Sequence, residues 1–388
     1  MKKTLTNYIA CLSRPLIALI ILLLIIFGHR PAFAISLTDS ASPVPAAAMK
    51  LVGFCADPKA GLDAQAVAIL VDYILEPKAY KEGDLPKIKE TPGAYYEFDT
   101  RISFSSFLQY AYSSQVPAAL TSPASLRYSL WTGLPGELQK MPASWKMVPP
   151  AGKPVIIYGL QHDGITPDLT TGVYYEYDLK KTIILLNHKG RQVFISISKQ
   201  IDISDIGKKG VILGNDEDWN YFYSGIPGST KAGLGWVKSY IYDFFAVGIY
   251  VESGPMVRSG NFQWIRAGWS GVNFVQTSHI IKGMKRNAKN SKTILESPKL
   301  PAPSQIASIY KKLSSLPQND LVERYTALQQ ARKSLAILSG KIDKNEIKKQ
   351  DSYANTPKEQ IIEELMLEYF KITLGKSSLL GKKVVSGN

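Results

Sequence analysis

The chain has 388 residues, of which 45% are hydrophobic and 20% are charged, and its 46 basic and 32 acidic residues give a net charge of +14. A chain of this composition can bury a core, which excludes an intrinsically disordered protein. Its length suits two domains or one large domain with an appended segment.

The N-terminal segment has the pattern of an export signal. An apolar run of 12 residues (16–27) is preceded by three basic residues, Lys2, Lys3 and Arg14. Ala32-Phe33-Ala34 follows it as a small-x-small cleavage site. A helix that spans a bilayer needs roughly 20 apolar residues. We therefore expect a signal peptide over 1–34 with cleavage after Ala34, a periplasmic or secreted protein, and no transmembrane span after cleavage.

Cleavage would change both the charge and the cysteine content. It would remove four basic residues and no acidic one, so the net charge would fall from +14 to +10. The mature chain would keep only Cys55, which excludes an internal disulfide, and we expect this thiol to be buried. Nucleic acid is the usual partner of a basic protein, but export excludes it and favours anionic lipid or glycan.

The first part of the mature chain is interpreted in two segments. Residues 35–50 are rich in Ser, Ala and Pro without periodicity, which predicts a linker. Residues 51–153 form a mixed, partly helical N-terminal region, with helices expected over 62–75 and 104–112. Pro77 would end the first of these helices.

A β-rich core is predicted over 154–296, ending in a basic helix that begins at Thr277. Residues 173–178 and 182–186 are rich in aromatic and β-branched residues, and 191–199 alternates apolar residues with Ser196 and Ser198. This alternation predicts a hairpin with one solvated face. Short turns between successive strands favour an antiparallel meander, either a curled sheet or a small barrel.

The C-terminal region, 304–388, is predicted to be helical. Capping-box patterns at Asp320 and Thr356 precede apolar stripes at helical spacing, and Gly340 and Gly375 end them. We expect these two helices to form an antiparallel hairpin. The fold class is therefore α+β, with a meander core, N-terminal helices and a C-terminal helical hairpin.

The sequence contains no strong catalytic signature. It lacks a nucleophile elbow, a Walker phosphate loop, a Gly-x-Gly-x-x-Gly loop and a zincin motif, so neither a cofactor nor a metal is predicted. His162 beside Asp163 could act as an acid–base pair. Glu176 and Glu252 could act as paired carboxylates if a fold brought them to the separation of about 5–10 Å that glycoside cleavage requires.

Two clusters favour binding. Aromatic residues alternate with glycines between 219 and 271, and the candidate ligand-binding residues are Trp219, Trp236, Tyr240, Trp264 and Trp269. Flat rings bind sugars or acyl chains, but the same residues could equally fill a core. A stripe at helical spacing, formed by Lys282, Lys285, Arg286 and Lys289, could bind anions or could be a solvated face.

Three functions remain open. The leading hypothesis is a non-catalytic envelope protein that binds an amphipathic or anionic ligand such as lipid or glycan. The second is an envelope-directed hydrolase that uses His162 or the paired carboxylates. The third is a structural or assembly protein that docks a protein partner through residues 304–388.

Overall fold

The computed structural model describes residues 42–77, 82–133, 143–147, 149, 152–228, 231–232, 235–342 and 353–381. All of them belong to one compact unit, 36–388. The predicted signal peptide (1–34) lies outside the described residues, as does the segment 35–41 that follows it.

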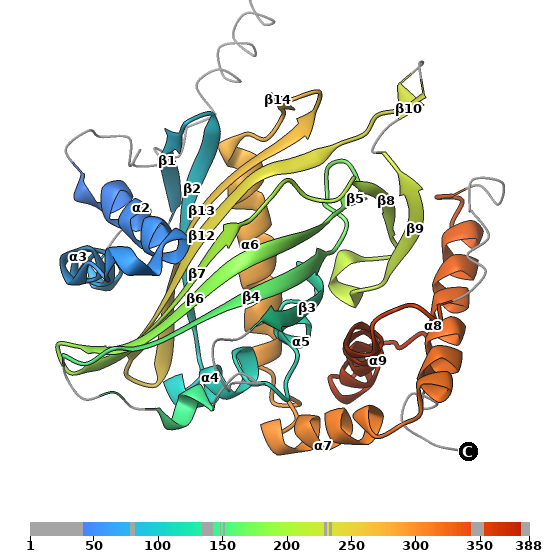
Figure 1. The fold of residues 1–388 in the computed structure, drawn as a ribbon. Coiled ribbons are helices and arrows are strands. Elements are labelled where there is room, and N and C mark those ends of the chain that lie inside the picture. Colours follow the sequence, from blue (N-terminus) through green and yellow to red (C-terminus); the bar gives the residue numbers. More distant parts are fainter. Residues whose placement is uncertain are drawn as a thin grey trace, which may run out of the picture. The chain divides into compact units, whose positions relative to one another are not determined.

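The described residues form a mixed α+β fold built on one large antiparallel sheet (Figure 1). Its hydrogen-bonded order is β1-β2-β13-β12-β7-β6-β4-β3. The bounds of these strands are β1 Glu82–Ile88, β2 Thr91–Thr100, β3 Leu126–Gly133, β4 Val155–Ile165, β6 Glu176–His188, β7 Arg191–Gln200, β12 Tyr240–Ser253 and β13 Met256–Trp269.

Most of this sheet follows the predicted meander, because its strands lie side by side in the order in which they occur in the sequence: β3, β4, β6, β7, β12 and β13. The β1–β2 hairpin then joins the far side of β13, where Thr100 pairs with Val257. Among the described strands β1 and β3 stay at opposite edges, so the sheet is open and the predicted barrel is not confirmed.

Short strands extend the sheet or form small sheets beside it. Strand β14 (Val272–Asn273) pairs with β13, and β10 (Lys231–Ala232) pairs with β11 (Gly235–Trp236). A three-stranded sheet has the order β5-β8-β9, with bounds Val173–Tyr174, Lys208–Ile212 and Tyr221–Pro227.

One face of the large sheet is covered by α2 (Pro43–Ala56) and α3 (Ala64–Leu75). Alternate residues of β7, Val193, Ile195 and Ile197, pack with these helices in one apolar core. Helix α2 begins inside the range 35–50 for which a linker is predicted. Ser42 caps it by accepting a hydrogen bond from the Val44 amide, and burial of its apolar side supplies the stabilisation that the sequence pattern does not reveal.

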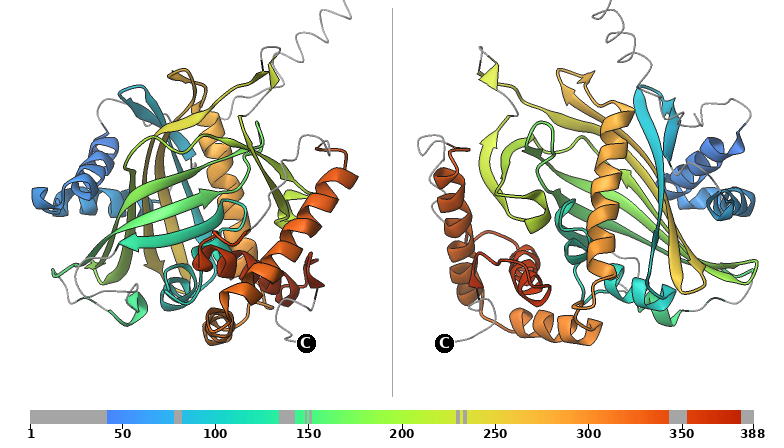
Figure 2. Two further views of the ribbon diagram at one scale, coloured as in Figure 1. Left: turned by 45° about the vertical axis from the view of Figure 1, so that its right-hand side comes forward. Right: turned by 180° about the vertical axis from the view of Figure 1, so that it is seen from behind.

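The opposite face carries the remaining helices, and Figure 2 shows α6 crossing it. Their bounds are α4 Phe104–Ala111, α5 Ala118–Thr121, α6 Thr277–Leu295, α7 Pro303–Ser314, α8 Gln318–Leu338 and α9 Lys358–Thr373. Phe194 points to this side, where it joins a second apolar core. Ser196 and Ser198 are buried here too, at 5% exposure each, so the hairpin face predicted to be solvated is covered.

The C-terminal helices pack together, but not as the predicted antiparallel hairpin. In Figure 1, α9 is viewed nearly end-on while α8 lies in the plane of the picture, so the two helices cross. Helix α9 is buried nearly all round, against α5, α7, α8 and β3. This burial brings its charged residues into the interior, and these side chains define the site described next.

Candidate functional site

A cavity of about 440 Å³ lies between the large sheet and the helices α4 to α7 and α9. Part of its wall is aromatic and comes from five elements and the end of α4: Phe98, Phe107, Tyr112, Trp131, Tyr250 and Tyr310. Glu359, an exposed residue of the first turn of α9, also lines it, so the cavity reaches the surface there. Its volume is within the range of pockets that hold small molecules, about 300–1,000 Å³.

Another part of the wall is polar and includes buried ionisable groups. Ser129, Gln161, Asp163, Lys181, Asn261 and Glu363 contribute to it. Strands β3, β4, β6 and β13 supply the first five through the alternation of side chains across a sheet, and α9 supplies the sixth. An apolar pocket with a few converging polar groups of shifted pKa is the usual form of a binding or active site.

Two carboxyl groups in this cavity meet at Ser129. The Ser129 hydroxyl donates to Asp163 Oδ1 over 2.6 Å, and its amide donates to Glu363 Oε2 over 3.0 Å. Burial raises the pKa of Glu363 to about 8, and the charges of Asp163 and Glu364 act in the same direction. Burial also raises the pKa of Asp163. Glu363 is therefore mostly protonated at neutral pH and can donate a hydrogen bond.

Lys181 is the one basic residue in the lining of this cavity among the described residues. It sits in the central strand β6, opposite Ser198 of β7, and its Nζ donates to Ser198 Oγ over 2.8 Å. Burial lowers the pKa of the amine, and the nearby charge of Asp163 partly opposes this effect. The amine therefore loses its proton more readily than that of an exposed lysine.

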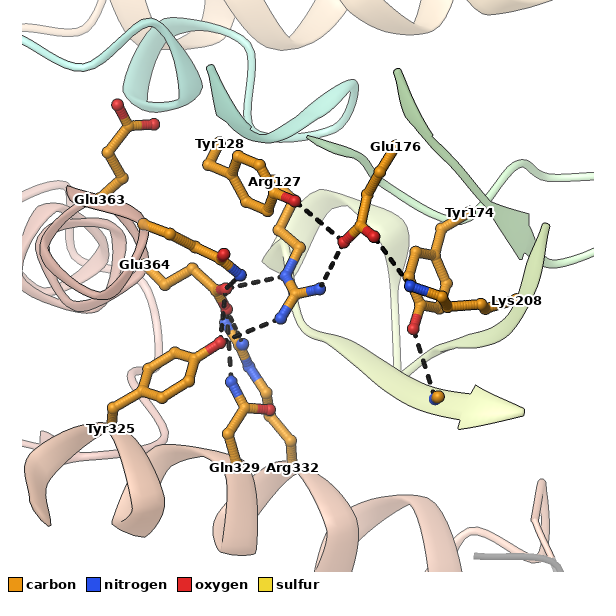
Figure 3. Close-up of polar contacts among 12 residues, drawn as sticks. Arg127, Tyr128, Tyr174, Glu176, Lys208, Tyr325, Gln329, Arg332, Glu363 and Glu364 are labelled. Atoms are coloured by element: carbon orange, nitrogen blue, oxygen red, sulfur yellow. Dashed lines mark hydrogen bonds and ion pairs between the residues drawn. The ribbon is translucent and has the colours of Figure 1, made fainter. Parts of the chain in front are cut away.

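The carboxyl group next to Glu363 has the opposite environment, shown in Figure 3. Glu364 accepts hydrogen bonds from Arg127 Nε and Tyr325 OH, each over 2.8 Å, and from Arg332. Burial alone would raise its pKa, but the two guanidinium groups and these hydrogen bonds lower it to about 2. The network ties α9 to α8 and β3, and so fixes the helix that carries Glu363.

In Figure 3 the Glu363 carboxyl points away from the Arg127 cluster, toward α5 and β3. Consecutive residues on a helix project about 100° apart, so they can reach different surroundings. Glu364 thus forms structural ion pairs with Arg127 and Arg332, whereas the Glu363 side chain lines the cavity.

His162 and Asp163 do not form the predicted acid–base pair. They are consecutive residues of β4, so their side chains lie on opposite faces of the sheet. His162 Nδ1 instead lies 2.8 Å from Asp178 Oδ1, and its ring lies beside Tyr128 at 5.9 Å between centroids. Of the predicted pair, only Asp163 enters the cavity.

Glu176 and Glu252 are not brought together either. Glu176, the first residue of β6, accepts hydrogen bonds from Lys208 over 2.8 Å and Tyr128 over 2.9 Å. Glu252 accepts a hydrogen bond from the Gln192 amide, next to the other end of β6. That strand has 13 residues, roughly 40 Å at about 3.3 Å per residue. The separation excludes the two-carboxylate glycosidase arrangement for this pair.

The predicted aromatic ligand-binding residues are dispersed. Trp219 and Trp264 are fully buried in separate cores, and their indole N–H groups donate to Asn290 and to the Pro86 carbonyl. Tyr240 and Trp269 lie at one end of the β12–β13 pair, where Trp269 stacks on Phe274 at 3.9 Å. The side chain of Trp236 lies outside the described part of the chain. Trp219 and Trp264 therefore serve as core residues.

The basic stripe of α6 is largely neutralised within the chain. Lys285 pairs with Glu82 over 2.6 Å, Arg286 pairs with Asp216, and Lys289 pairs with Glu217. Only Lys282 of the stripe is exposed without such an ion pair among the described residues. The acidic run Asn215–Asp218 and the basic stripe thus bind each other, which leaves little of the stripe free for an external anion.

A shallow groove beside α6 repeats this arrangement. Lys285, Lys289 and Lys292 line it, but Lys292 also pairs with a carboxylate, that of Glu296 over 3.2 Å. The groove is consequently a weaker candidate for ligand binding than the sheet–helix cavity.

Lys181 and Glu363 were missed as site residues, although the sequence carries a signal for one of them. Lys181, Ile183 and Leu185 alternate on one face of a strand, and a lysine on an otherwise apolar face is a candidate for burial. Glu363 lies beside the apolar stripe of its helix, and its burial depends on elements that are distant in sequence.

Comparisons of the chain with models of protein families, with curated proteins and with solved structures found no match. Within the described ranges, no helix combines the length and the hydropathy needed to cross a membrane. Among the same residues, no group of three or more His, Cys, Asp or Glu side chains is placed to hold a metal ion.

Proposed function

We propose that the protein is an exported, non-catalytic envelope protein that binds a small amphipathic molecule in the sheet–helix cavity. The observation that supports this most is the divided lining of the cavity, with aromatic rings and a set of hydroxyl, amide and ionisable groups. An apolar group of a ligand can bury its surface against the rings, and a polar group can find partners at Ser129, Asn261 and Glu363.

The charge of the lining changes the expected class of ligand. Three carboxyl groups, of Asp163, Glu359 and Glu363, line the cavity together with a single lysine. Glu363 is mostly uncharged at neutral pH, but the other two carboxyl groups still outnumber the lysine. The lining therefore disfavours an anionic headgroup, and the proposal is for a neutral or cationic amphipathic molecule. This replaces the anionic ligand suggested by the net charge of the whole chain.

The proposal retains one element of the fold prediction. The large sheet would curl along the cavity as its wall, and α4 to α7 and α9 would close the side that further strands close in a barrel. A ligand would enter near Glu359, where the lining reaches the surface.

The test is a fluorescence titration of the mature chain, residues 35–388, with the neutral dye N-phenyl-1-naphthylamine. We expect saturable binding at one site. Ala111→Phe and Ala118→Phe place a ring at positions that line the cavity and should each weaken binding at least tenfold. The control is Ala64→Phe, at an exposed position of α3 on the other face of the sheet.

Circular dichroism and the urea midpoint establish that each variant is folded before it is titrated. Absence of saturable dye binding to the wild-type chain would contradict the proposal. So would equal affinities for wild type and both folded cavity variants.

A further inference from the structure

The lysine in the cavity, Lys181, is placed differently from its sequence neighbour Lys180. Lys181 lies in β6, near the middle of the sheet, with β4 on one side and β7 on the other. Its neighbour Lys180 points to the opposite face, is exposed, and donates to the Ala56 carbonyl over 2.9 Å. Two consecutive lysines therefore present one amine to the cavity and one to solvent.

Three elements, β4, β7 and α9, supply the polar side chains around the Lys181 amine. Asp163 of β4 and Glu363 of α9 line the same cavity, and Ser198 of β7 is the one hydrogen-bond partner of Nζ among the described residues. On the opposite face of the sheet, the Cys55 thiol of α2 would favour the ammonium form only as a thiolate, and burial raises its pKa. The amine thus has no carboxylate within ion-pairing distance in the described structure, which leaves it available to a ligand.

We propose that Lys181 condenses with the carbonyl group of an aldehyde or ketone ligand to form an imine inside the cavity. This inference rests on the proposed function, since the cavity must first admit the ligand. A lysine that lines a cavity and has a pKa lowered by burial is the type of group that forms such adducts.

The groups needed for proton transfer line the same cavity. The neutral Lys181 nitrogen attacks the carbonyl carbon, the C=O π bond breaks, and the oxygen takes the proton of the Glu363 carboxyl. The resulting ammonium gives one proton to a carboxylate, which yields a neutral carbinolamine. That carboxylic acid then protonates the hydroxyl, and water leaves as the C=N bond forms. The iminium N–H proton returns to the same carboxylate, which leaves the neutral imine. The net reaction is amine plus carbonyl to imine plus water, and no oxidant or reductant takes part.

The two carboxyl groups suit opposite halves of this sequence. Glu363 is protonated at neutral pH and can act as the acid, whereas Asp163, which accepts from Ser129 over 2.6 Å, can receive a proton. The aromatic wall would hold the remainder of the carbonyl compound and exclude water from the imine, which hydrolyses readily in solution.

The test is reductive trapping. The full mature chain is incubated with benzaldehyde and sodium cyanoborohydride at pH 7 in an amine-free buffer, and labelled lysines are located by peptide mass spectrometry. We expect Lys181 to be labelled at least tenfold more than Lys180, because an amine with the ordinary pKa of about 10.4 is less than roughly 0.1% neutral at pH 7. Equal labelling of the two lysines, or preferential labelling of Lys180, would overturn the proposal.

Two variants separate reactivity from simple exposure. Glu363→Gln removes the acid of the sequence without removing a charge at neutral pH, so it should lower labelling of Lys181 and leave Lys180 unchanged. Lys181→Gln should remove the labelled peptide. If the wild-type chain binds the dye but Lys181 is not labelled more than Lys180, this inference alone is contradicted. If the wild-type chain does not bind the dye, the proposed function is contradicted.

Discussion

Glu363 and Glu364 are consecutive residues of α9, and they should change the stability of the protein in opposite directions. Glu363 is held in a cavity that favours its neutral form, with a pKa of about 8, and Glu364 is held between two guanidinium groups, with a pKa of about 2. We predict that Glu363→Gln stabilises the protein at pH 8 and that Glu364→Gln destabilises it at pH 7.

The magnitudes follow from the ionisation equilibria. A pKa raised from 4.5 to about 8 means that the contribution of Glu363 is fully present below pH 4.5 and is lost as pH rises to 8. At about 1.4 kcal/mol per tenfold change, this loss is at most roughly 5 kcal/mol. Glutamine keeps the acceptor for the Ser129 amide and does not ionise, so Glu363→Gln avoids the loss.

The same argument has the opposite sign for Glu364. Its pKa is lowered from 4.5 to about 2, so its contribution is present above pH 4.5 and is lost as pH falls toward 2. It amounts to roughly 3 kcal/mol at pH 7, in line with the roughly 3–5 kcal/mol cost of leaving a buried charge without its partner. Glu364→Gln leaves the buried guanidinium groups of Arg127 and Arg332 without their carboxylate partner.

The assay is urea denaturation of wild type and both variants at half-unit steps from pH 4 to pH 8.5. The difference in unfolding free energy between Glu363→Gln and wild type should be near zero at pH 4 and should increase up to pH 8. Parallel pH profiles for Glu363→Gln and wild type would refute the assignment of a neutral buried carboxyl. A Glu364→Gln variant as stable as wild type at pH 7 would refute the role given to the Arg127 network.

Two further predictions concern packing on the α2 side of the sheet. Cys55 is 2% exposed, and burial raises the pKa of its thiol. It should therefore not react with a thiol reagent in the native protein, and it should react completely in guanidinium chloride. Complete reaction within minutes in buffer would contradict this prediction. A Cβ at Gly93 would lie 2.2 Å from Trp264 Nε1, so Gly93→Ala should lower stability by about 3 kcal/mol. Its control is Gly53→Ala in α2, where nothing lies within 4 Å of the new Cβ; the same thermal midpoint in both variants would argue against the predicted clash.

Secondary structure with a strong local signal was predicted well. The helix predicted over 62–75 is α3, and the alternation in 191–199 is β7 paired with β6 by a two-residue turn. Local periodicity and capping suffice for such elements. Helix α2 was missed because its stability comes from burial of Leu51 and Phe54 against strands more than a hundred residues away.

The candidate site was predicted only in part, because it is made by distant pairing. Asp163 was recognised as ionisable, but its assigned partner His162 lies on the other face of the strand. Ser129, Lys181 and Glu363 come from three elements that local patterns cannot bring together. The aromatic residues were conspicuous in the sequence, yet the two most buried of them, Trp219 and Trp264, fill cores.

The place of the β1–β2 hairpin in the sheet constrains the order of assembly. Thr100 of β2 pairs with Val257 of β13, the last long strand of the sheet. Until residue 269 has left the ribosome, the edge of β2 that pairs with β13 has no partner strand. The edge of β7 that pairs with β12 is unpaired for the same reason. Because contacts so distant in sequence form late, both pieces keep an unpaired edge up to that point in synthesis. A nascent chain of this protein therefore needs its edges kept apart until the β12–β13 hairpin joins them.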